Sequence, residues 1–310
     1  MADSERRSPT PSTSEIKTSN EDDKSFQPPS NDKKEPTTIA KDPKEDCTDV
    51  LAFLGFGKFS GGAYYNKYGH KVEAEIRESC GSDDDLKIIQ EAKLLSQLDH
   101  ENIIKILAFD KTGPRFAMES TTLGNINLAL ETYNFTSKSI LSLLKCVTSA
   151  MVYISQRQYV LRNLRSENIY LSSPSNCKIG NFRYCQYVGD TDGIYVDQDG
   201  ALVWEYSAPE VKKEKRFSTK SDVWDLALLG CELYNVDPEI ASRFAMPPGS
   251  TRRLFLDRFM FEVDMPPLPL KCPFPLWYYL ENITDHDPNE RPPFPEILQE
   301  LREYDDWQIS

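Results

Sequence analysis

The chain has 310 residues, of which 36 are basic and 49 acidic, and its formal net charge is −13. Such an acidic chain does not favour nucleic acid, because phosphate contacts need clustered Lys and Arg side chains, so no nucleic-acid partner is expected. The length allows one large domain or two ordinary ones, and 39% hydrophobic residues suffice for a buried core.

The seven cysteines are scattered along the chain and form no C-x-x-C pair. This pattern is typical of reduced thiols rather than of a disulfide frame or a zinc site. No run of about 18 apolar residues is present, and the N-terminus lacks the apolar core of a signal peptide. We therefore expect a cytoplasmic protein with no membrane span.

Residues 1–46 are strongly polar. They include 19 charged residues, 12 Ser or Thr and 6 Pro. A segment of this composition cannot bury enough apolar surface to offset the entropy lost on ordering. We expect residues 1–46 to be a disordered tail.

The composition changes from about Cys47. Short apolar runs alternate with glycines over 51–76 and predict strands joined by a tight loop. Residues 83–98 predict a helix with an apolar stripe that also contains Glu91. Residues 103–107 and 115–118 predict two further strands.

Helical patterns dominate after about residue 136. They predict four helices, over 137–156, 219–235, 274–284 and 293–304. The order of elements therefore predicts a small β-rich lobe followed by a larger α-helical lobe, which is an α+β architecture.

Several short motifs follow one another along the chain. Gly55-x-Gly57 alone indicates only a tight turn. Five later segments give it weight: YVLRNLRSENIYL at 159–171, KIGNFR at 178–183, YSAPE at 206–210, TKSDVW at 219–224 and DPNERPPFPEIL at 287–298.

In this order and spacing the segments resemble the H-R-D…N loop, the D-F-G turn, the A-P-E end of the activation segment and the late helical motifs of protein kinases. The stretch 264–273 with Leu276-Trp277 is similar to the tyrosine-kinase branch. The resemblance implies a bilobal protein-kinase-like fold over 47–310, with an N-lobe at about 47–121 and a C-lobe at about 122–310.

The resemblance also identifies positions whose chemistry has changed. Phosphoryl transfer uses an Asp to accept the hydroxyl proton, and an Asp and an Asn to hold Mg²⁺. The proton-accepting position is Asn163, which follows Arg162. The metal-binding Asp of D-F-G corresponds to Asn181, and the second metal position is retained as Asn168. An amide hardly accepts a proton, and hard cations favour carboxylates.

The lysine position on the third strand admits two registers. The spacing from the glycine loop favours Glu75, and a shift of two residues gives Arg77. Glu91 corresponds to the helix glutamate that pairs with this lysine, so it would face either a like charge or an arginine. In both registers the small residue that packs on adenine becomes Glu, either Glu73 or Glu75, and a desolvated carboxylate there opposes a nucleotide.

Met118 corresponds to the residue that gates the back of the nucleotide pocket. The resemblance thus implies a degenerate nucleotide site formed by Gly55, Gly57, Glu73, Glu75, Arg77, Glu91 and Met118.

The positions that serve folding are kept. Phe182, Leu161, Leu95 and Ile106 correspond to the apolar column that joins the lobes, Asp222 to the anchor of the Arg162 loop, and Glu210 and Arg291 to a buried ion pair. Tyr184, Tyr187, Tyr195 and Tyr206 lie in or beside the activation segment. They are either packing residues, which we favour, or phosphorylation sites whose phosphate pairs with Arg162 or Arg183.

We therefore expect a pseudokinase of the tyrosine-kinase type that acts as a scaffold or allosteric regulator in phosphorylation signalling. Its expected partner is a protein, either an active kinase or that kinase's substrate. No cofactor is expected. The alternative is a weakly active, ATP-dependent tyrosine kinase with unconventional motifs, which would use ATP and Mg²⁺.

Overall fold

A computed structural model describes residues 58–60, 63–110, 113–198, 207–235 and 272–304. The tail at 1–46, predicted to be disordered, and the glycines Gly55 and Gly57 lie outside these residues.

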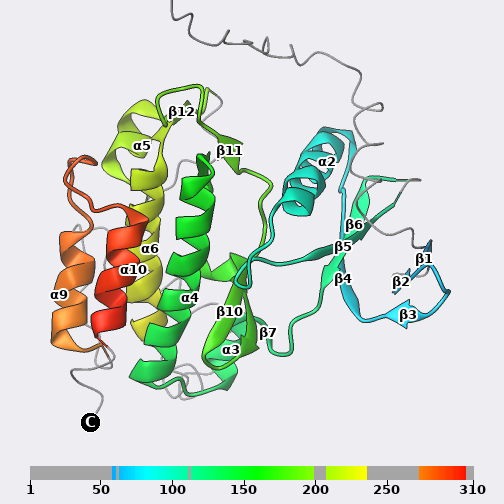
Figure 1. The fold of residues 1–310 in the computed structure, drawn as a ribbon, viewed down its shortest axis with the longest axis horizontal. Helices are drawn as coiled ribbons and strands as arrows, with labels where there is room; N and C mark the ends of the chain where they lie inside the picture. The colour runs from blue at the N-terminus through cyan, green and yellow to red at the C-terminus, as the bar shows by residue number, and fades with distance from the viewer. Residues whose placement is uncertain (1–57, 61–62, 111–112, 199–206, 236–271, 305–310) are drawn as a thin grey trace, which may run out of the picture. The chain divides into compact units, whose positions relative to one another are not determined.

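Among the described residues, the N-terminal part contains two small antiparallel sheets and one helix (Figure 1). One sheet has the order β1-β2-β3 and the other has the order β4-β6-β5. The elements are β1 Lys58–Ser60, β2 Ala63–Tyr65, β3 Lys71–Val72, β4 Ala74–Glu78, α2 Ser82–Gln97, β5 Ile106–Phe109 and β6 Arg115–Glu119.

Helix α2 brings one charged side chain into this core. The apolar stripe predicted from the sequence, Ile88, Ala92 and Leu95, is buried. Glu91 lies within the same stripe and is only 1% exposed. A carboxylate buried to this extent requires a charged or hydrogen-bonding partner, and the partner is found on β4.

The C-terminal part is mainly helical, and α4, α6 and α10 lie side by side in it (Figure 1). Its helices are α3 Ile126–Thr132, α4 Ser137–Gln156, the 3-10 turn η1 Ser166–Asn168, α5 Pro209–Glu214, α6 Thr219–Asn235, α9 Phe274–Asn282 and α10 Phe294–Glu303. Its short strands are β7 Gly124–Asn125, β8 Tyr159–Val160, β9 Ile169–Ser173, β10 Asn176–Ile179, β11 Gln186–Tyr187, β12 Tyr195–Val196 and β13 Arg216–Phe217. The four helices predicted after residue 136 are confirmed, and strands precede helices as the α+β prediction required.

Helix α4 is the centre of the helical part. Thr136 caps it by accepting the Ser139 N–H, and its apolar face packs against α10 and β10. By length and composition α4 is the one helix among the described residues that could cross a membrane, although half of its most apolar window is buried inside the fold. A single helix of this kind is weak evidence for a membrane span, because the core helix of a folded domain has the same length and composition.

The core is continuous between the strands and the helices. Leu95 of α2, Ile106 of β5, Leu161 and Phe182 all belong to one buried cluster. The apolar column that the resemblance implied is therefore present.

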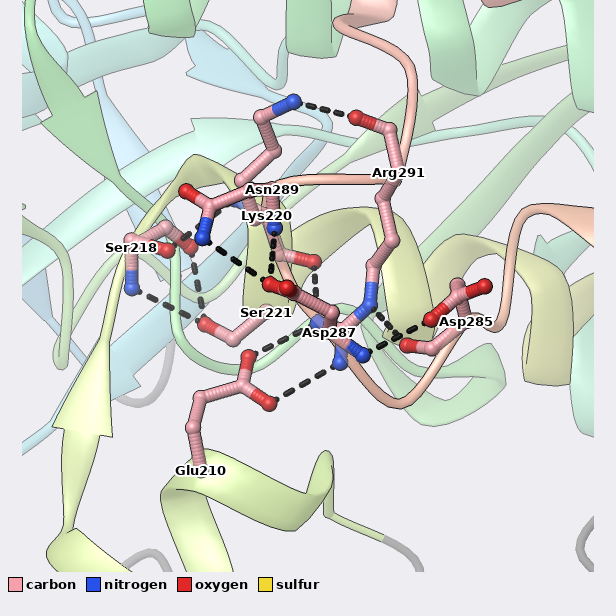
Figure 2. Close-up of polar contacts among 8 residues, drawn as sticks. All are labelled: Glu210, Ser218, Lys220, Ser221, Asp285, Asp287, Asn289 and Arg291. Atoms are coloured by element: carbon pink, nitrogen blue, oxygen red, sulfur yellow. Dashed lines mark hydrogen bonds and ion pairs between the residues drawn. The ribbon is translucent and has the colours of Figure 1, made fainter.

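A second buried contact fixes the chain before α10. Arg291 donates two parallel hydrogen bonds to Glu210, 2.7 Å to Oε1 and 2.9 Å to Oε2 (Figure 2). Its remaining donors reach the carbonyl oxygens of Asp285, at 2.7 Å, and of Lys220, at 2.9 Å. The predicted ion pair is confirmed, and its arginine has every nitrogen engaged and no exposed side-chain surface.

We expect Arg291→Gln to lower the free energy of unfolding by about 3–5 kcal/mol, because it leaves a largely buried carboxylate without its partner. Urea denaturation measures the change. Arg302→Gln, on the exposed face of α10, is the matched control and should stay within about 0.5 kcal/mol of the wild type. Equal losses in the two variants would contradict the assignment.

Candidate functional site

The loop after β8 is held in place by one buried carboxylate. Asp222 of α6 accepts the backbone N–H of Leu161 at 2.8 Å and that of Arg162 at 2.9 Å. Burial raises the pKa of Asp222 to about 7, against these two hydrogen bonds and the Arg162 charge, which lower it. The predicted anchor is therefore present, and it sets where the following residues point.

Three asparagines follow one another through this loop and the turn after β10. Asn168 donates from Nδ2 to the backbone carbonyl of Asn163, at 2.9 Å. Asn181 donates from Nδ2 to Oδ1 of Asn168, at 2.8 Å. Asn181 has a φ of +57°, a left-handed conformation that asparagine tolerates better than most residues. The two metal positions are thus hydrogen-bonded to each other, and Asn168 is also bonded to the backbone of Asn163.

The asparagine series continues into a buried ion pair. Nη1 of Arg77 donates to Glu91 Oε1 at 2.9 Å and to Asn181 Oδ1 at 2.9 Å. Glu91 Oε1 also accepts the backbone N–H of Phe182, at 2.9 Å. Burial raises the pKa of Glu91, and Arg77 opposes the shift through its charge and its hydrogen bond.

This contact corrects the register that the glycine spacing favoured. Arg77 and not Glu75 faces Glu91. The physical reason is electrostatic, because two carboxylates at a site where Glu91 is 1% exposed would both lack a counterion. Arg77 therefore occupies the lysine position, and Glu75 occupies the position of the small residue that packs on adenine.

Glu75 and Met118 are paired across β4 and β6. Both line a cavity of about 450 Å³ together with Arg77, Asn181 and Tyr170. Burial raises the pKa of Glu75, and the nearby Arg77 lowers it. Glu73 is exposed and is not among the residues that line this cavity.

The residue after Phe182 adds a second cation. Arg183 stands where the D-F-G motif has glycine, and its Nη1 lies 2.8 Å from Oδ1 of Asp84 on α2. The turn after β10 is thus tied to α2 by two ion-pairing residues, Glu91 and Asp84.

The comparison with known proteins decides the family. The model for protein tyrosine and serine/threonine kinases matches residues 50–301. The chain belongs to the protein kinase family. Tyrosine-protein kinase SRK3 of Spongilla lacustris is 28% identical over 223 residues, which are 70% of this chain and 64% of that protein. This chain spans less than two thirds of that relative's length. The kinase domain of this chain is tyrosine-kinase-like.

The residues at the two metal positions of this kinase site do not fit Mg²⁺. A hard cation prefers carboxylate oxygens, and the two candidate ligands are amides. Oδ1 of Asn181 already accepts from Arg77, and Oδ1 of Asn168 already accepts from Asn181. Within the described ranges no group of three or more His, Cys, Asp or Glu side chains could hold a metal.

The activation segment contains a contact that the sequence did not reveal. Nη2 of Arg162 lies 2.5 Å from Oδ2 of Asp197, and both side chains are almost fully buried. The guanidinium lies 4.3 Å from the centroid of the Tyr195 ring and 4.4 Å from that of Phe217. Tyr195 and Phe217 are paired across β12 and β13. Arg162 is therefore enclosed by aromatic rings and paired with a carboxylate of the chain itself.

Sequence reasoning brought most of the site together and missed two residues. Arg77, Glu91, Asn168 and Asn181 form one hydrogen-bonded group, as their positions in the kinase motifs suggested. Asp197 has no local signal, since its partner lies 35 residues away. Tyr170 follows Asn168 by two residues, and that spacing could have drawn attention to it.

We expect Asp197→Ala to lower the free energy of unfolding by about 3–5 kcal/mol, because the buried guanidinium of Arg162 would lose the carboxylate that it contacts. Chemical denaturation followed by circular dichroism measures the loss. The exposed Asp190, in the same segment, gives the control Asp190→Ala, for which a change within about 0.5 kcal/mol is expected.

A double-mutant cycle with Arg162→Met separates the pair from other effects. The coupling between Asp197 and Arg162 should exceed about 1 kcal/mol. Additive losses would show that Asp197 acts through another residue.

Proposed function

We propose that this kinase-family domain is a pseudokinase that transfers no phosphate. It acts as a scaffold or allosteric regulator of a protein partner in phosphorylation signalling. The observation that carries this proposal is the hydrogen-bonded series from Glu91 through Arg77 and Asn181 to Asn168. It uses the metal positions for contacts within the fold.

The chemistry at the base position supports the proposal. Asn163 stands where a kinase has the Asp that accepts the hydroxyl proton. The amide has no basic site at neutral pH, so the nucleophile would have to lose its proton without help. Loss of a general base typically costs about 10²–10⁴-fold in rate.

The charges around the cavity also support the pseudokinase proposal. Glu75 brings a carboxylate to the wall beside Met118. A nucleotide would have to desolvate this carboxylate on binding, and its phosphates would be repelled by it. Arg183 is engaged with Asp84, so its charge is already compensated by α2.

The preserved contacts support a binding role. The Arg291–Glu210 pair, the Asp222 anchor and the apolar column are intact. They stabilise the helical part and the activation segment, which are surfaces that a protein partner can recognise. We propose that the partner is an active kinase or that kinase's substrate, and that the two proteins bind in the cytoplasm.

One observation favours the alternative of a weakly active, ATP-dependent tyrosine kinase. The Arg77–Glu91 pair keeps a cation where the phosphate-binding lysine is expected. Phosphoryl transfer depends mostly on positioning and electrostatic stabilisation, so a low residual rate is the outcome that distinguishes the two functions.

We expect no phosphate transfer from ATP to a tyrosine peptide, or to the chain itself, with either Mg²⁺ or Mn²⁺. A radiometric assay on purified protein measures this, with Asn163→Ala prepared in parallel. Turnover that the variant retains in full belongs to a contaminating kinase and is subtracted. Turnover that Asn163→Ala abolishes would overturn the pseudokinase proposal in favour of the alternative.

A further inference from the structure

Tyr170 is a buried aromatic residue that none of the preceding assignments uses. It lies on β9, between β7 and β10, and is 8% exposed. It also lines the cavity that contains Met118, Glu75 and Arg77. Its ring therefore projects from the helical part into the space beside β4.

The ring fits closely against the backbone of the next strand's end. A Cβ atom added at Gly180 would lie 2.6 Å from Cε2 and 3.1 Å from Cδ2 of Tyr170. Real side chains do not approach this closely, so the ring takes the room that a side chain at position 180 would need. Gly180 directly precedes Asn181, and Tyr170 and Asn181 line the same cavity.

Tyr170 shares the cavity wall with the charged residues Glu75, Arg77 and Arg183. Its ring packs on Gly180 and faces the same cavity as Arg77. Burial raises the pKa of Tyr170, and the charge of Arg77 lowers it.

We infer that Tyr170 narrows the nucleotide site of this chain, because its ring takes up the space beside Gly180, on the cavity wall that it shares with Arg77, into which an adenine nucleotide would extend. The inference rests on the proposed function and adds a steric cause to the chemical ones.

Two features oppose a nucleotide here, so the test must separate them. Glu75 repels phosphate by its charge, whereas Tyr170 excludes the ligand by its volume. Four proteins distinguish the causes: the wild-type chain, Tyr170→Leu, Glu75→Ala and the double variant. The probes are adenosine and ADP, each without metal, and isothermal titration calorimetry measures binding.

We expect no measurable binding to the wild type at millimolar probe. Tyr170→Leu should tighten adenosine binding at least about tenfold, and the double variant should bind ADP at least about tenfold more tightly than Glu75→Ala. Tyr170→Phe keeps the ring, so it should bind adenosine and ADP no more tightly than the wild type does. Tyr278→Leu changes an exposed tyrosine on α9 and serves as the matched control.

Folding of each variant is checked by circular dichroism and its melting temperature. If Tyr170→Leu does not fold, Tyr170→Met takes its place, because its flexible side chain fills irregular space without a rigid ring. A folded double variant that binds no better than Glu75→Ala would overturn the inference, and so would a wild type that binds as well as Tyr170→Leu. The phosphate-transfer assay on the same preparations decides the proposed function separately.

Discussion

The buried carboxylate of Glu91 is the constraint on which the site depends. At 1% exposure it must be compensated, and it takes Arg77 from β4 and the backbone N–H of Phe182 from the turn after β10. These two contacts join α2, the sheet and the helical part at one point. Asn181 is drawn into the same group through Arg77. Arg77, Glu91, Asn181 and the backbone of Phe182 are thus engaged with one another at the point where the strands meet the helical part.

Replaced residues and retained residues have different consequences for folding and for catalysis. Replacing a metal-binding or proton-accepting carboxylate by asparagine removes charge but keeps size and hydrogen-bonding capacity. The fold loses little, because amides can satisfy one another, as Asn181 and Asn168 do. Contacts whose loss would expose a buried charge, such as Arg291 with Glu210, are kept.

Much of the fold could be predicted from the sequence, because it depends on periodicity. Helix α4 was placed at its observed residues, since apolar side chains at helical spacing must face the core. The position of Asn181 followed from its place in the KIGNFR segment at 178–183. The register of β4 could not be decided, because glycine spacing is local whereas the Arg77–Glu91 contact depends on which charge meets α2. Asp197 and Tyr170 were missed for the same reason, since only the folded chain brings them to Arg162 and Arg77.

The contact between Arg162 and Asp197 has a consequence for how the activation segment is controlled. An arginine enclosed by Tyr195 and Phe217 has little room for a further anion. Its counterion is encoded in the polypeptide, so no modifying enzyme has to install it and no phosphatase can remove it. The Arg162–Asp197 contact is therefore present in the unmodified chain, and a partner that recognises it would not depend on a kinase having acted first.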